Sequence, residues 1–215
     1  MCTGITLFYG SRKIFSLPEF HVDAHKKILL QWPSGSGKSS FLSLLAGLIY
    51  PSEWSLKYSS TGVVATPSSS DFLNFRRTNI SITFSDPLFF DDLNVEENIL
   101  FPHMFAGLSY DQNWKEYLIE EMEIGHILRS SITNLSSGEK DRINLVRALL
   151  YRQSILLLDE PWSHMDSALF QKFLTLLSSY LEEVRPTLIL VSHSEKYIPL
   201  VDHVYICEKW VFSHW

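Results

Sequence analysis

The chain has 215 residues, 46% of them hydrophobic, which is enough for one domain with a substantial core. The net charge of −6 argues against a broad nucleic-acid-binding face, because such a face neutralises phosphates with clustered Lys and Arg. The two cysteines are too few for a disulfide framework, no secretion signal is recognisable, and no apolar run reaches the roughly 20 residues that span a bilayer. We therefore expect a soluble, cytoplasmic protein.

Short apolar runs alternate with longer helical patterns, which predicts an α/β fold with a mostly parallel core sheet. Strands are expected at 27–31, 80–84, 154–158 and 187–191, and a small strand with loops in the Ser-rich segment 58–70. Helices are expected at 39–48, 114–123 and 168–181, where apolar residues recur at helical spacing. A further helix follows Ser136, a residue type that caps helices. The aromatic-rich stretch from residue 86 to the helix at 114 is expected to form loops.

A phosphate loop is predicted in the segment ILLQWPSGSGKSS, residues 28–40. The pattern for such a loop is G-x-x-x-x-G-K-[ST], in which backbone N–H groups form a nest for phosphate oxygens and the lysine adds a positive charge. The Ser hydroxyl after the lysine can bind Mg²⁺. A chance Gly/Ser turn is disfavoured, because a strand precedes the segment and a helix pattern follows it. The residues expected to hold ATP are Ser34, Gly35, Ser36, Gly37, Lys38, Ser39 and Ser40.

Trp32 departs from this pattern, because it occupies the position of the first glycine. The amides that contact phosphate lie downstream of it, so an indole that packs outward against a neighbouring helix would leave the nest intact. If the position instead requires φ > 0, a bulky residue there is strained. The sequence leaves both alternatives open.

Acidic and imidazole side chains follow two buried strands. The segment SILLLDEP ends its strand with Asp159 and Glu160, and LILVSHS places His193 just after another strand. The first carboxylate can hold Mg²⁺ and the second can act as general base toward water, while a histidine can stabilise charge that develops on a γ-phosphate. An ordinary Asp-Glu-Pro turn and a loop histidine without a chemical role are the alternatives. The phosphate loop upstream favours the catalytic interpretation.

With these motifs in order, nearly the whole chain resembles the nucleotide-binding subunit of an ATP-binding cassette (ABC) transporter. The segment Leu135–Arg142, LSSGEKDR, resembles the signature that distinguishes this family from other phosphate-loop proteins. Ser163–Asp166 resembles the D-loop, His193 the switch histidine, and Tyr9 the aromatic residue that stacks on adenine. Looser text, including FRRTNISITF and DDLNVEENILFP, resembles the lipoprotein-release and macrolide-efflux type of exporter.

The resemblance implies a single nucleotide-binding domain over residues 1–215, with a small antiparallel β subdomain and a helical subdomain at about 86–134 inserted in the core. It implies a dimer, homo- or heterodimeric, in which Ser136 and Gly138 contact the ATP of the partner. It also implies an integral-membrane permease subunit, which holds the chain at the cytoplasmic face of the membrane. The aromatic stretch 88–105 would receive a helix of that subunit; filling the core of the helical subdomain is the alternative.

Several positions depart from the family pattern. Ser85 stands where a metal-sensing glutamine is usual, so the expected metal ligands are Ser39, Asp159 and Ser85. Ser137 replaces a signature glycine, Trp162 a smaller residue, and His25 a turn glycine. We expect slow but real ATP hydrolysis with Lys38, Glu160 and His193 as catalytic residues. The alternatives are a catalytically weak regulatory subunit paired with an active cassette and, less favoured by the acidic charge, a soluble ABC ATPase acting on DNA or ribosomes.

Overall fold

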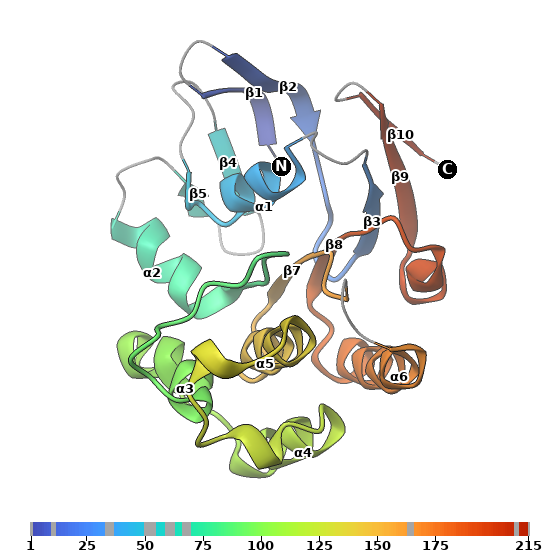
Figure 1. Ribbon diagram of the computed structural model, residues 1–215. Coiled ribbons are helices and arrows are strands. Elements are labelled where there is room, and N and C mark those ends of the chain that lie inside the picture. Colours follow the sequence, from blue (N-terminus) through green and yellow to red (C-terminus); the bar gives the residue numbers. More distant parts are fainter. Residues whose placement is uncertain are drawn as a thin grey trace.

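The computed structural model describes residues 2–9, 12–32, 37–49, 55–58, 63–65, 70–162, 166–208 and 211–214, with side chains described for 20–32, 37–49, 72–162 and 166–206. A six-stranded sheet has the order β10-β9-β3-β8-β7-β6, and a four-stranded sheet has the order β2-β1-β4-β5 (Figure 1). In the larger sheet only β10 is antiparallel to its neighbour, and in the smaller sheet every pairing is antiparallel. The predicted mostly parallel core sheet and small antiparallel sheet are both confirmed.

The larger sheet consists of β3 (Lys27–Gln31), β6 (Ile80–Ile82), β7 (Ile155–Asp159), β8 (Thr187–Val191), β9 (His203–Glu208) and β10 (Val211–His214). The smaller sheet consists of β1 (Cys2–Tyr9), β2 (Arg12–Phe20), β4 (Ser55–Tyr58) and β5 (Val63–Ala65). The helices are α1 (Lys38–Leu45), α2 (Ser70–Asn79), α3 (Val95–Ala106), α4 (Gln112–Glu121), α5 (Ser137–Leu149) and α6 (Ser167–Val184), with a 3-10 helix η3 at Glu195–Leu200.

Each face of the larger sheet is buried against its own group of helices, because alternate residues of a strand point to opposite faces. Leu156 and Leu158 of β7 belong to one core cluster with residues of α3, α4, α5 and α6. Leu157, between them, belongs to a second cluster with Trp32, residues of α1 and phenylalanines of α2. This burial on both faces accounts for the continuous apolar runs from which the central strands were predicted.

The segment before α4 is a helix over much of its length, so the loops expected there are a wrong prediction. The backbone N–H of Glu97 donates to the side chain of Asn94 at 2.9 Å, and the N–H of Asn94 donates to the carboxylate of Glu97 at 2.8 Å, a capping box that begins α3. Gly107 ends the helix with φ of 67°. Pro102 lies inside α3 and interrupts the sequence pattern of a helix. The helix α2 was likewise not predicted.

Within the described ranges, none of the helices combines the length and the apolar character needed to cross a membrane.

Candidate active site

The carboxyl ends of β3, β7 and β8 lie next to one another in the larger sheet. The register pairs Asp159 of β7 with Val191 of β8, and Leu30 of β3 with the same Val191. Beyond the strands, the N–H of Glu160 donates to the carbonyl of Val191 at 2.9 Å, and the N–H of Ser192 donates to that of Leu30 at 3.2 Å. Parallel strands therefore bring the predicted acidic residues and the predicted histidine to one edge of the sheet.

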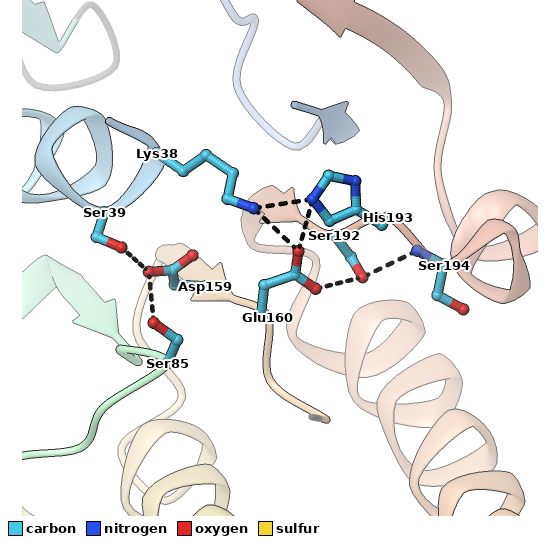
Figure 2. A network of polar contacts seen from close by, with 8 residues as sticks. All are labelled: Lys38, Ser39, Ser85, Asp159, Glu160, Ser192, His193 and Ser194. Atoms are coloured by element: carbon cyan, nitrogen blue, oxygen red, sulfur yellow. Dashed lines mark hydrogen bonds and ion pairs between the residues drawn. The ribbon is translucent and has the colours of Figure 1, made fainter. Parts of the chain in front are cut away.

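Lys38 links the beginning of α1 to both strand ends. Its Nζ donates to Oε1 of Glu160 at 3.3 Å and lies 2.9 Å from Nε2 of His193 (Figure 2). The lysine and glutamate side chains are only 13% and 24% exposed, and the histidine lies across the opening at 51%. The preceding Gly37 has φ of 94°, a left-handed conformation that glycine adopts without strain where the chain turns into the helix. The three predicted catalytic side chains thus form one cluster.

Glu160 is held in an uncommon backbone conformation, with φ of 40°. Its Oε2 accepts a hydrogen bond from Oγ of Ser192 at 3.0 Å, and that hydroxyl accepts one from the N–H of Ser194 at 3.2 Å (Figure 2). Left-handed geometry at a non-glycine residue persists only where its surroundings determine it, and it concentrates at functional sites. The carboxylate is therefore oriented from two sides, by a cation on one and a serine hydroxyl on the other.

Asp159 lies at the end of β7 between two serine hydroxyls. Oγ of Ser39 donates to its Oδ2 at 2.5 Å and Oγ of Ser85 donates to the same atom at 3.4 Å, while its own N–H donates to Oγ1 of Thr83 at 3.2 Å (Figure 2). Its Oδ1 is buried and has no hydrogen-bond partner in the described part of the chain. Burial raises the pKa of this carboxyl, against the hydrogen bond from Ser39 and the charge of Lys38.

These oxygen atoms fit a magnesium ion. Mg²⁺ takes hard oxygen ligands, usually one or two carboxylates together with substrate phosphates and water. Ser39, Asp159 and Ser85 offer a hydroxyl, a carboxylate and a second hydroxyl side by side, and the unpartnered Oδ1 of Asp159 remains available as a ligand. The short serine at position 85 reaches the carboxylate directly in this arrangement.

Ser136 begins α5 as its N-cap, as predicted. The N–H of Glu139 donates to its Oγ at 3.3 Å, and the N–H of Ser136 donates to the Glu139 carboxylate at 2.8 Å. The hydroxyl and the N–H of Ser136 hold the pKa of the Glu139 carboxyl below its ordinary value. Among the described residues, no hydrogen bond or ion pair joins Ser136 or Gly138 to the cluster around Lys38.

Trp32 packs against α1 and is buried, with 2% of its surface exposed. Its ring meets that of Phe41 edge to face, with centroids 5.3 Å apart and planes at 77°. It does not belong to the described non-glycine residues with positive φ, so the alternative of a strained backbone at this position is excluded. His25, where a turn glycine was expected, has φ of 65°. The glycine-like conformation is thus needed at position 25 and not at position 32.

Some predicted site residues lie outside the described residues: Ser34, Gly35 and Ser36 of the phosphate loop, positions 163–165 of the D-loop, and the side chain of Tyr9. Ser40 lies in the first turn of α1. Ser192 and Thr83 contact the site carboxylates and were not singled out from the sequence. The signal for Ser192 was its position between a buried strand and His193.

Residues 17–163 match the family model described as ABC transporter. The thiamine import ATP-binding protein of Shigella sonnei is 36% identical over 195 residues, which cover 89% of this chain and 80% of that protein. The protein of the same name from Salmonella typhimurium is 34% identical over 176 residues, 80% of this chain and 72% of that protein. Among solved structures, the dimeric ATP-binding cassette MJ0796 in a post-hydrolysis state with ADP and Pi has a TM-score of 0.85 at 20% identity, and the match covers 100% of this chain and 98% of that one.

Proposed function

Because this chain belongs to the ABC transporter family and is an ATP-hydrolysing motor subunit of a transporter, we propose that the cluster of Lys38, Asp159, Glu160 and His193 is its hydrolytic site. The observation that carries this assignment is the position of the Glu160 carboxylate. One of its oxygens faces Lys38 and His193, and the other accepts the Ser192 hydroxyl. Such an arrangement orients a carboxylate toward a water molecule that attacks a phosphate held by the lysine.

Each side chain then has a distinct role. Lys38 provides the positive charge for the β- and γ-phosphates, and Glu160 accepts the proton of the attacking water. His193, next to the lysine, donates a hydrogen bond to the γ-phosphate as negative charge develops there. Ser39, Asp159 and Ser85 would hold Mg²⁺, which supplies Lewis-acid stabilisation of the phosphate oxygens. Ser40 would donate to the α-phosphate from the first turn of α1.

The test of this assignment separates nucleotide binding from hydrolysis. Lys38→Ala is expected to weaken ATP binding and to reduce hydrolysis by at least a hundredfold, because it removes the only charge that the phosphate loop contributes. Lys26→Ala is the matched control, since Lys26 is an exposed residue in the turn before β3. Binding of a fluorescent ATP analogue and steady-state release of phosphate would be measured for both variants. Retention of wild-type hydrolysis in Lys38→Ala would contradict the assignment.

We propose that one chain holds only half of each complete site. Ser136 and Gly138 are exposed or half-exposed at the beginning of α5 and make no described contact with the cluster of their own chain. A head-to-tail dimer would place them on the ATP of the partner, with the backbone N–H groups of the α5 N-terminus directed at its phosphates. In this arrangement residues 1–215 act as one nucleotide-binding domain, and the segment at about 86–134 moves as a helical subdomain.

The surface for the permease is proposed at the aromatic stretch 88–105. A cavity of about 450 Å³ opens between α2, β6, α3 and α5, with Phe105 and Leu88 at its edge. Leu88, Phe90, Met104 and Phe105 are 76%, 48%, 69% and 65% exposed, a cluster of large apolar side chains that is typical of an interaction site. Phe89 instead packs against the core. Some rings therefore fill the subdomain while others stay available for a membrane-subunit helix.

We further propose that the transporter imports a small organic molecule of the thiamine type. The support is the name of the relatives described above, which are thiamine import ATP-binding proteins, and it favours import over the exporter type suggested by the looser text. The chain would lie at the cytoplasmic face of the membrane, bound through its permease. Uptake of labelled thiamine into cells that lack the chain, with and without its restoration, tests this substrate class. Restored growth on thiamine without restored uptake would contradict it.

A catalytically weak regulatory role is the second candidate, and the Ser85 and Ser137 replacements favour it. Ser85 nevertheless contacts Asp159, and the cluster around Glu160 is complete apart from residues outside the described ranges. The ATPase rates of the chain alone and with its permease separate these functions. A rate that stays near zero in the assembled complex would favour the regulatory role.

A further inference from the structure

A second cavity lies behind the site, on the other side of Glu160 and His193. It has a volume of about 490 Å³, and the residues that define it are Glu160, Trp162, Ser192, His193, Lys196 and Tyr197. Lys38 contacts Glu160 and His193 but does not line this cavity. Figure 2 shows the same division: Lys38 approaches Glu160 from one side, and Ser192 and Ser194 lie on the other. We call this cavity the rear chamber.

Two polar groups that border the rear chamber lack partners. The indole N–H of Trp162 and the hydroxyl of Tyr197 are both buried and have no hydrogen-bond partner among the described residues. Tyr197 is 1% exposed, so water outside the protein does not satisfy its hydroxyl. A buried polar group without a partner costs about 1–3 kcal/mol, and in a native structure it points to an ion, a water molecule or a ligand that completes it.

Ring packing explains why these two side chains stay in place. The indole of Trp162 stacks on Phe173 with centroids 4.3 Å apart and an angle of 15°. The ring of Tyr197 meets Phe170 edge to face at 5.6 Å, and Nζ of Lys196 lies 5.0 Å from the centroid of Phe170. Aromatic packing thus fixes one donor that cannot accept and one hydroxyl at the wall of the chamber, with a lysine nearby.

The chemistry of this lining matches an oxyanion. Trp162 can only donate, and burial raises the pKa of Tyr197, with the negative charge of Glu160 adding to the effect, so its hydroxyl stays protonated and able to donate. Lys196 and His193 add cationic or donor groups, and Ser192 adds a hydroxyl. Glu160 is the only acid among the lining residues. A tetrahedral anion with several acceptor oxygens would satisfy the two unpartnered groups together.

We propose that the rear chamber binds orthophosphate after hydrolysis and holds it on its way out of the site. The inference rests on the proposed hydrolytic function of Glu160. In that reaction the water oxygen forms a new bond to the γ-phosphorus, the bond from that phosphorus to the β–γ bridging oxygen breaks, and its electron pair leaves with ADP. The proton of the water passes to Glu160. The products are ADP and orthophosphate, and the orthophosphate forms next to the wall of the chamber.

The experiment titrates inorganic phosphate into the protein saturated with Mg-ADP and follows binding by calorimetry. Trp162→Phe and Tyr197→Phe each remove one donor while keeping the aromatic ring. We expect each to weaken phosphate binding about tenfold, the effect of one lost hydrogen bond to a charged group. Tyr180→Phe is the matched control, because the Tyr180 hydroxyl is also buried without a partner but does not line the chamber. It should bind phosphate as the wild type does.

The outcomes are distinct. Wild-type phosphate affinity in both Trp162→Phe and Tyr197→Phe, or no phosphate binding to the wild type, would overturn the proposal. Slower bond cleavage in a quenched single turnover, with phosphate affinity unchanged, would also overturn it, because the chamber would then position the attacking water. The titration requires no hydrolysis, so failure of the hydrolytic assignment appears separately, as retained ATPase activity in Lys38→Ala. Thermal melting of each variant checks that it folds.

Discussion

Replacement of Trp32 by alanine should destabilise the fold strongly and leave the nucleotide site largely unaffected. The indole is 2% exposed and packs on Phe41 in the core cluster that covers one face of the larger sheet. Loss of a buried tryptophan costs about 3–5 kcal/mol, a large part of the roughly 5–15 kcal/mol by which a domain is stable. For a chain of this size the melting temperature should fall by about 6–20 °C.

The assay is thermal unfolding followed by circular dichroism, with Trp32→Phe as the control that keeps an aromatic ring at the same place. Trp32→Phe should lose much less stability, and its affinity for ATP should stay within about threefold of wild type, because the indole packs on α1 through Phe41. An unchanged melting temperature in Trp32→Ala would refute the assignment of this residue to the core. A tenfold change in ATP affinity in folded Trp32→Phe would show that the indole shapes the phosphate loop.

Three further predictions concern the fold around the site. Glu96→Gln should cost about 3 kcal/mol in urea unfolding, because the Lys115 ammonium, 7% exposed and 2.5 Å from the carboxylate, loses the anion that compensates its burial. The hydrogen bond from Lys115 lowers the pKa of Glu96 from 4.5, so this stabilisation is complete above that pH and is lost as pH falls toward the lowered pKa; the wild type should lose more stability than Glu96→Gln over this range, and equal losses would contradict the pairing. Gly47→Ala should destabilise by about 2–4 kcal/mol, since φ is 63° and the new Cβ would lie 2.0 Å from Phe72, whereas Gly107→Ala, at φ of 67° with open space, should cost only about 1 kcal/mol.

The fold was largely predictable where burial produces a continuous pattern. The strands at 27–31 and 187–191 have the bounds expected from the sequence, because strands covered on both faces read as uninterrupted apolar runs. The helix α3 was not predicted, although Asn94 and Glu97 carry the spacing of a capping box. Pro102 inside the helix and the aromatic residues around it hide the helical period, and tertiary packing overrides that local signal.

The site was predictable as a set of residues but not as a geometry. Lys38, Asp159, Glu160 and His193 were each identified from a motif, and the parallel register of β3, β7 and β8 brings them together. The support of Glu160 by Ser192 depends on the pairing of β7 with β8 and on a positive φ, and neither is visible in a linear pattern.

The most direct measurement of the central claim compares ATP hydrolysis in Glu160→Gln and in Glu182→Gln. Glu182 is an exposed acid on α6, so its amide variant changes the net charge equally without touching the site. Glutamine keeps the shape of Glu160 but cannot accept the proton of water, and general-base catalysis contributes about 10²–10⁴-fold. We predict that Glu160→Gln binds Mg-ATP with wild-type affinity and hydrolyses it at least a hundredfold more slowly, while Glu182→Gln hydrolyses it normally. Wild-type turnover in Glu160→Gln would contradict the account.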